Sequence, residues 1–275
     1  MTPIELLILA FAGIVAGILA GFLGIGGGTV LVPLLISLGN ESIQAVATSS
    51  LSIVITASAG SIQNWRMGYL DINNVLSMAL PALITAQIGV FLANLFPEYL
   101  LLFTFGLLLI SNIYLVDLRK KIVARKKIEE EGNQDQEVVE ENNENNETNV
   151  HKIQEFWHRI ITGGTGGLLA GLFGVGGGII MVPLQIVLLN ENIKKAIQTS
   201  LGVIVITAIS ATAGHAYSGN VLWLTGAILG FGGLLGVQFS TRFLPKLPDK
   251  VVSLAFRSLL AILSIYIFWK AWQSY

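Results

Sequence analysis

The chain is a series of long apolar runs separated by short polar turns, and one charged tract divides the series near its middle. The first run extends from Ile4 to Leu23, and Glu41 is the only ionisable residue between Leu6 and Trp65. Helical runs of this length, at about 1.5 Å per residue, cross the hydrocarbon core of a bilayer. The pattern therefore predicts an all-α, polytopic helical membrane protein.

Further apolar runs lie on both sides of the charged tract, and each is long enough for one crossing. We expect these spans at 43–64, 72–96 and 99–116 before the tract and at 196–217, 221–244 and 251–269 after it. Composition agrees, because 53% of the 275 residues are hydrophobic and only 12% are charged, whereas a soluble domain carries about a quarter charged residues. The start of the chain lacks the basic segment of a signal peptide, so we expect the first run to remain as a span.

A glycine-rich segment occurs twice in the same register. The first copy, from Gly21 to Leu34, reads Gly-Phe-Leu-Gly-Ile-Gly-Gly-Gly-Thr-Val-Leu-Val-Pro-Leu, and the second, from Gly171 to Leu184, keeps every Gly and the Pro. Consecutive glycines interrupt a helix because they lose the most backbone entropy on ordering. The apolar run after each copy is about ten residues, or half a bilayer. We therefore predict, in each half, a Gly-broken re-entrant pair of half-membrane helices followed by three full spans.

The charged tract predicts the domain boundaries. A basic cluster at 119–127 precedes an acidic, Asn-rich stretch at 129–149 with almost no apolar residues, which is typical of a disordered linker. A regulatory or partner-binding tail is the alternative to a simple tether. The expected domains are a first transmembrane repeat at 1–118, a charged cytoplasmic linker at 119–155 and a second transmembrane repeat at 156–275.

The distribution of Lys and Arg favours an odd number of crossings in each half, and hence two inverted-topology repeats. With an odd number, the basic residues outside the spans fall on the side of the linker, except for Lys270. Since positive residues accumulate on the cytoplasmic side, we expect the linker and the loop at 66–70 inside and both termini outside. The first Gly-broken pair then enters from outside and the second from the cytoplasm.

The two glycine motifs are the candidate substrate-binding site. In hydrocarbon, the N–H groups that begin each short helix need an acceptor inside the protein, and they carry the positive end of the helix dipole. A small anion is such an acceptor, and helices broken at matching places in two halves are typical of transporter sites. The binding residues predicted from the motifs are Gly24, Gly26, Gly27, Gly28, Thr29, Gly174, Gly176, Gly177 and Gly178.

Polar side chains in the spans that follow the motifs extend the candidate site. The sequence aligns Thr48-Ser49-Ser50-Leu51 with Gln198-Thr199-Ser200-Leu201, and it aligns Asn64 with His215. For His215, a proton relay, a substrate contact and a hydrogen-bonded interfacial histidine all remain open. The additional binding residues predicted here are Thr48, Ser49, Ser50, Asn64, Thr199, Ser200 and His215. Other glycines have the spacing of close helix packing instead, namely Gly17, Gly21, Gly167 and Gly171.

Other classes of function lack their characteristic residues. The sequence contains no cysteine, no Walker motif, no His/Glu metal cluster and no carboxylate at the centre of a span. An intramembrane enzyme is disfavoured because the spans contain no set of nucleophile, base and orienting group. We expect no metal, no cofactor and no nucleic-acid partner. The expected partners are the lipid bilayer, a small anion and a coupling ion such as H⁺ or Na⁺, and the oligomeric state stays open.

The doubled motif Gly-x-x-Gly-x-Gly-Gly-Gly-x-x-x-Val-Pro-Leu, with a hydroxyl-rich run after each copy, resembles the sulfite exporter TauE/SafE family of bacterial membrane transporters. The similarity covers both halves and leaves out only the linker. It implies a multi-pass protein of the bacterial cytoplasmic membrane that moves a small sulfur-containing or organic anion, such as sulfite or a sulfonate. The chain departs from the commoner pattern in its long acidic linker and in Gln198-Thr199-Ser200, which stands where the first half has Thr48-Ser49-Ser50.

The predicted function is therefore secondary transport of such an anion by alternating access around the paired motifs. An anion channel that uses the same midplane site is the alternative.

Overall fold

The computed structural model describes residues 3–111 and 144–273, and within these ranges every regular element is a helix. The helices of the first half are α1 (Pro3–Leu23), α2 (Gly28–Ser37), α3 (Ser42–Arg66), α4 (Ile72–Leu95) and a further helix at Glu98–Ser111. Those of the second half are α6 (Glu144–Phe173), α7 (Gly178–Leu188), α8 (Ile193–Tyr217), α9 (Trp223–Phe243), a 3₁₀ turn η1 (Leu244–Lys246) and α10 (Asp249–Gln273). The all-α prediction is confirmed.

Six helical segments in the described ranges are long and apolar enough to cross a membrane, namely α1, α3, α4, α8, α10, and α9 together with η1. Large apolar side chains cover the outside of the bundle, as with Phe11 and Leu80, each 68% exposed, and Phe231, 65% exposed. In water such a surface would be unfavourable, whereas lipid accommodates it. These features confirm a polytopic membrane protein. The span predicted at 99–116 is described only as far as Ser111.

The two helices of each Gly-broken pair differ in length, which corrects part of the prediction. α1 has 21 residues and α6 has 30, whereas α2 has 10 and α7 has 11. Only the second helix of each pair is therefore of half-membrane length. The reason is that α1 contains no helix breaker before Gly24, which has the first positive φ of the described chain.

The predicted linker also differs from the structure where the two can be compared. α6 begins at Glu144, so residues 144–155 are the first turns of a helix rather than a structureless tether. An ion pair between Arg159 and Glu155, one turn apart at 3.5 Å, supports α6 at 155–159. The remainder of the predicted linker, at 119–143, lies outside the described residues.

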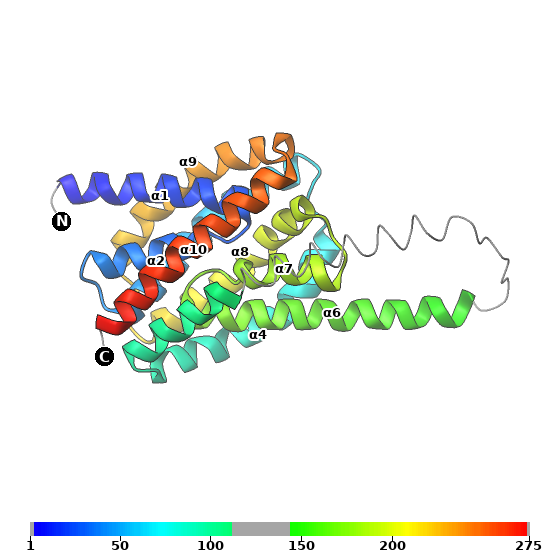
Figure 1. The fold of residues 1–275 in the computed structure, drawn as a ribbon, viewed down its shortest axis with the longest axis horizontal. Helices are drawn as coiled ribbons and strands as arrows, with labels where there is room; N and C mark the ends of the chain where they lie inside the picture. The colour runs from blue at the N-terminus through cyan, green and yellow to red at the C-terminus, as the bar shows by residue number, and fades with distance from the viewer. Residues whose placement is uncertain (1–2, 112–143, 274–275) are drawn as a thin grey trace.

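Each half packs against the other in the same way. α1 lies along α9 and α6 lies along α4, so the first helix of each half pairs with a span of the other half. α3 and α8 contact each other between these pairs, and each contacts the short helix of its own half. In Figure 1, α1 begins and α10 ends at one end of the bundle, whereas α6 begins at the opposite end and runs antiparallel to α1. This is the arrangement expected of two inverted repeats.

Glycines bring the paired helices into backbone contact. A Cβ atom on Gly17 of α1 would collide with the carbonyl oxygen of Gly233 in α9, and one on Gly167 of α6 would collide with that of Ala82 in α4. Gly171 is equally close to the backbone of Ala86 in α4, and Gly21 is equally close to the side chain of Ser240 in α9. Small residues at such interfaces let membrane helices approach closely. The packing interpretation of these four glycines is confirmed.

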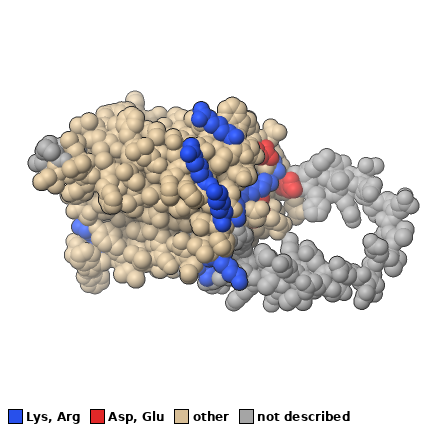
Figure 2. Space-filling view, turned by 90° about the horizontal axis from the view of Figure 1, so that it is seen from above, with Lys and Arg blue, Asp and Glu red and all other residues tan. Residues whose placement is uncertain are grey.

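Lys and Arg side chains gather at one end of the bundle, which we call the basic end and define by Arg66, Lys194, Lys195, Arg242 and Lys246. One pocket there joins the loop after α3, the start of α8 and the turn after α9. On the face drawn in Figure 2, Lys and Arg lie mainly toward this end, whereas Lys270 belongs to the last turn of α10 at the other end. The distribution matches the expectation of a cytoplasmic basic end, whose sidedness in a membrane stays a prediction.

Candidate functional site

Each glycine motif forms the break between a long helix and a short one. Gly24, Gly26 and Gly27 have φ angles of 68°, 76° and 83°, and the corresponding angles in the second motif are 62°, 76° and 76°. L-residues with a side chain rarely adopt such left-handed values, so the break requires glycine. Gly27 and Gly177 then serve as the N-caps of α2 and α7, and neither helix has a side-chain cap.

The two motifs cross each other in direct backbone contact. A Cβ atom on Gly28 would collide with the carbonyl oxygen of Gly174, and one on Gly178 would collide with that of Gly24. Every residue at 24–28 and 174–178 is buried. The structure therefore brings together the glycines that the doubled motif singled out, with one set from each half. We call this contact the motif crossing.

The first turns of α2 and α7 leave backbone N–H groups without a helical acceptor at the motif crossing. The hydrogen bonds nearest to the caps are those from Val30 and Leu31 to the Gly27 carbonyl, and the second motif repeats them at the Gly177 carbonyl. Among the described residues, no backbone acceptor pairs with the N–H groups of 26–29 or 176–179. Thr29 is also fully buried, and its Oγ1 has no partner within the described ranges. The positive N-termini of α2 and α7, together with several N–H groups that lack a backbone acceptor, thus meet at the buried motif crossing.

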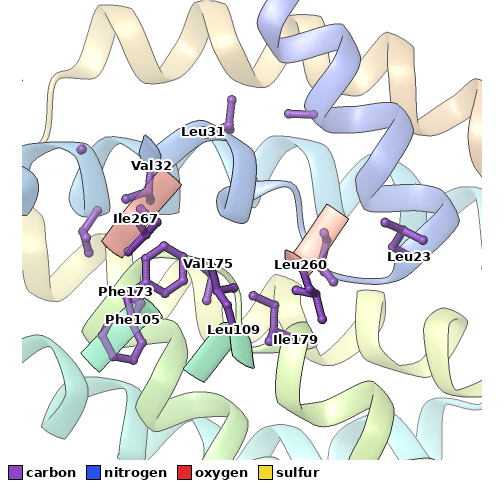
Figure 3. Close-up of a cluster of buried hydrophobic side chains, with 14 of the residues drawn as sticks. Leu23, Leu31, Val32, Phe105, Leu109, Phe173, Val175, Ile179, Leu260 and Ile267 are labelled. Atoms are coloured by element: carbon purple, nitrogen blue, oxygen red, sulfur yellow. The ribbon is translucent and has the colours of Figure 1, made fainter. Parts of the chain in front are cut away.

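Apolar side chains seal the motif crossing. Ile53 and Ile204, in the middle of α3 and α8, lie 3.2 and 3.3 Å from where a Cβ atom of Gly26 would be. Figure 3 shows Val175 and Ile179 of the second motif packed among side chains from other helices in the largest buried cluster. Because the motif residues are buried on all sides, the crossing is closed to solvent in this structure.

The hydroxyl residues predicted from α3 divide into three kinds. Ser49 Oγ donates to the carbonyl oxygen of Gly174 at 2.8 Å, so it reaches the motif crossing. Thr48 Oγ1 instead accepts from the backbone N–H of Leu222 at 3.1 Å, where it supports the start of α9. Ser50 Oγ donates to the carbonyl oxygen of Val46 in its own helix, as buried Ser often does in membrane helices, and its place in the site stays a prediction.

Near the corresponding residues of α8, some buried side-chain polar atoms have no hydrogen-bond partner in the described ranges. Thr199 is 1% exposed, and its Oγ1 has no partner in the described part of the chain. Ser200 Oγ accepts from Nε2 of Gln185 in α7 at 3.3 Å. Gln185 is fully buried, and its Oε1 is also without a partner in the described ranges. Sequence reasoning missed Gln185, although a single amide within an apolar short helix is a usable signal.

The structure corrects the alignment of α3 with α8 by one residue. Val46 lies against Gly174 of the opposite motif, and Ile197 lies against Gly24 in return. The Thr-Ser pair at 48–49 therefore corresponds to the Thr-Ser pair at 199–200. The offset changes after the short helices, because α7 has 11 residues and α2 has 10. With this offset Gln198 stands opposite Ala47, and Ser50 stands opposite Leu201.

Asn64 and His215 occupy equivalent positions but do not reach the motif crossing. Each lies near the C-terminal end of its helix, several turns from Ile53 or Ile204, and the two ends are on opposite sides of the bundle. Nε2 of His215 lies 3.0 Å from the carbonyl oxygen of Gly171, so this nitrogen carries the proton of that bond. Both side chains are fully buried, and both amide atoms of Asn64 lack partners in the described ranges. Their predicted role as direct contacts of an anion at the crossing is not supported by this placement.

The fold and the site define a class, a polytopic helical membrane protein whose halves meet at broken helices, as in secondary transporters. No cluster of three or more His, Asp or Glu in the described ranges has the arrangement of a metal site. A family model described as sulfite exporter TauE/SafE matches residues 9–267. The chain therefore belongs to this family of membrane transporters.

Curated relatives agree with this assignment. A "Probable membrane transporter protein YunE" of Bacillus subtilis is 24% identical over 93% of this chain and 94% of its own length. A relative from Xylella fastidiosa is 25% identical over 100% of this chain and 99% of its own, and one from Methanocaldococcus jannaschii is 24% identical over 87% and 88%. Both also carry the name "Probable membrane transporter protein". No solved structure matches the chain.

Proposed function

We propose that the protein is a secondary transporter of the bacterial cytoplasmic membrane that moves a small anion, sulfite, a sulfonate or a related sulfur-containing or organic anion. The observation that carries the proposal is the motif crossing, where the N-termini of α2 and α7 meet with unused N–H groups. Each helix N-terminus is equivalent to roughly half a positive charge, so the two together can offset about one negative charge. Glycine lets an anion approach the backbone closely.

The arrangement of the halves supports alternating access as the mechanism. The motif crossing is closed in this structure, so a substrate enters only when the contacts between the motifs separate toward one side. Because each half contributes one motif, rocking of one repeat against the other opens the site to alternate sides. A coupling ion such as H⁺ or Na⁺ is part of the proposal. An anion channel would need both sides open together, which a closed crossing with Ile53 and Ile204 in its centre disfavours.

The test is flux of sulfite into proteoliposomes that contain the purified protein. We expect counterflow: internal unlabelled sulfite should accelerate the uptake of external labelled sulfite, because a carrier returns faster when it is loaded. A channel gives no such acceleration, and its flux follows the membrane potential instead. Sulfite flux without counterflow would favour the channel. Absence of flux for sulfite, sulfonates and small carboxylates alike would remove the proposed function.

A further inference from the structure

The two long helices of the glycine motifs, α1 and α6, end in the same way. Gly24 and Gly174 donate the last backbone hydrogen bond of each helix, so the carbonyls of Gly21 and Gly171 are the first without a backbone donor in the described ranges. Both residues are buried. The last carbonyls of a helix carry the negative end of its dipole. Each helix end therefore favours a hydrogen-bond donor or a cation.

In the second half, a histidine supplies the donor at the end of α6. Nε2 of His215 lies 3.0 Å from the carbonyl oxygen of Gly171. Val90 of α4 lies between α6 and α8 at the same place. Its backbone nitrogen is 2.8 Å from where a Cβ atom of Gly171 would be, and its Cγ1 is 3.0 Å from where one of Gly214 would be. The end of α6 is thus satisfied by an N–H group and bordered by an apolar side chain.

In the first half, α9 borders the end of α1 with two hydroxyl groups. Thr241, the counterpart of Val90, has its Cγ2 3.2 Å from where a Cβ atom of Gly21 would be, and the side chain of Ser240 contacts the same position. Both hydroxyls donate their hydrogen to backbone carbonyls of described residues, at 2.7 Å from Thr241 and at 3.3 Å from Ser240. Because these hydrogens are engaged, the hydroxyls offer only oxygen lone pairs to a further group.

Asn64 of α3 is the counterpart of His215. Cγ2 of Thr241 also lies 3.7 Å from where a Cβ atom of Gly60 would be, and Asn64 follows Gly60 by one turn on the same face of α3. This shared contact and the equivalence with His215 place the Asn64 amide at the end of α1. Asn64 is fully buried, and neither Oδ1 nor Nδ2 has a partner within the described ranges. Such a buried amide calls for a water or an ion that satisfies it.

We propose that the end of α1, Asn64, Ser240 and Thr241 form a Na⁺ site, and that Na⁺ is the coupling ion. The proposal rests on the proposed function and deepens it. Its ligands are the Gly21 carbonyl, Oδ1 of Asn64 and the two hydroxyl oxygens, a set of the kind that binds Na⁺ at the ends of broken helices. The second half has no equivalent site, since the N–H of His215 occupies that position.

The charges around the site agree with a bound cation. The C-terminal dipole of α1 attracts Na⁺ on one side of the first glycine break, whereas the N-terminal dipole of α2 attracts the anion on the other side. Opposite charges across one break favour each other's binding, and this coupling is reciprocal. Arg66 and Arg242 are the ionisable residues nearest in sequence, and both are exposed at the basic end, where salt screens them.

The test measures melting temperature and sulfite affinity of the full-length protein, with Na⁺ or N-methyl-D-glucamine as the cation at constant ionic strength. Sulfite is added as its N-methyl-D-glucamine salt. Na⁺ alone should raise the melting temperature in a saturable manner, because it binds only the folded state. By calorimetry, saturating Na⁺ should tighten sulfite binding roughly tenfold, within the usual range for two linked sites.

Three variants separate a cation site from a structural amide. Asn64→Leu removes a buried amide without partners in the described ranges, so in N-methyl-D-glucamine it should melt no lower than the parent, and its response to Na⁺ should be lost. Thr241→Val should weaken Na⁺ binding roughly tenfold, the scale of one neutral group that contacts a charge. Thr104→Val is the matched control. It removes a similar bond, 2.7 Å to the Leu100 carbonyl one turn earlier, and should keep the full Na⁺ response.

The outcomes decide the site and the function separately. A Na⁺ response that Asn64→Leu abolishes and Thr104→Val keeps supports the site, and if Asn64→Leu does not fold, Thr241→Val takes its place in this comparison. No response of the parent, or one that survives these changes, overturns the site, while sulfite binding keeps the proposed function. Na⁺ stabilisation without tighter sulfite binding overturns the coupling. A Na⁺ response through Asn64 in a protein that binds none of the tested anions supports the cation site and removes the proposed function.

Discussion

Gly177→Ala should abolish sulfite flux and weaken sulfite binding by roughly a hundredfold or more, the loss expected when charge-assisted hydrogen bonds are removed. Position 177 has a φ of 76°, which costs an alanine about 1–2 kcal/mol. The new Cβ atom would also collide with the carbonyl oxygen of Gly166, so the start of α7 has to shift. The N–H groups of the first turn then no longer converge on the anion. Calorimetry with sulfite on the folded variant measures the loss.

Gly39→Ala is the matched control for backbone strain. Gly39 lies in the turn after α2 with a φ of 88°, and a Cβ atom there meets nothing within 4 Å. It should lower the melting temperature through the same left-handed strain, yet leave sulfite affinity unchanged. If the two variants lose affinity to the same extent, strain alone explains the effect of Gly177→Ala and the N-terminus of α7 has no part in binding.

Gly167→Ala should produce the second large effect, a loss of stability of about 1–3 kcal/mol from overpacking of the α4–α6 pair. The new Cβ atom would collide with the backbone of Ala82, which cannot move aside as a flexible side chain can. Gly164→Ala, three positions earlier in α6, meets only Thr85 Cγ2 at 3.8 Å and should be near neutral. Melting temperatures in the same detergent give the comparison. Equal values for the two variants would contradict the close-packed interface.

The sequence predicts the architecture well because the hydrocarbon core of a bilayer offers no hydrogen-bond partners to the backbone. An apolar run of spanning length has to satisfy its own backbone, so helices such as α3 (Ser42–Arg66) and α8 (Ile193–Tyr217) follow almost directly from the pattern. Exact in-register repetition of the glycine motif likewise predicts two equivalent halves. The position of the helix breaks follows from Gly24 and Gly174, where a side chain would not fit the positive φ.

Details that depend on packing between the halves were not predictable in the same way. Residues 144–155 read as a linker by composition, because a polar helix carries no hydrophobic signal of its own. The one-residue shift between α3 and α8 arises from the extra residue in α7, which only the contacts of Val46 and Ile197 reveal. Ser50 and Thr48 have the right chemistry for an anion site, but helix rotation directs one to its own backbone and the other to α9.

The central claim is that backbone N–H groups at the motif crossing hold the anion. It is tested most directly by NMR on protein labelled with ¹⁵N only at its 30 glycines, titrated with sulfite. The account predicts saturable downfield shifts of amide protons at Gly26–Gly28 and Gly176–Gly178, since hydrogen bonds to an anion deshield them. The packing glycines of α1 and α6 should stay unchanged. Saturable sulfite binding that leaves the motif amides unmoved would contradict the account.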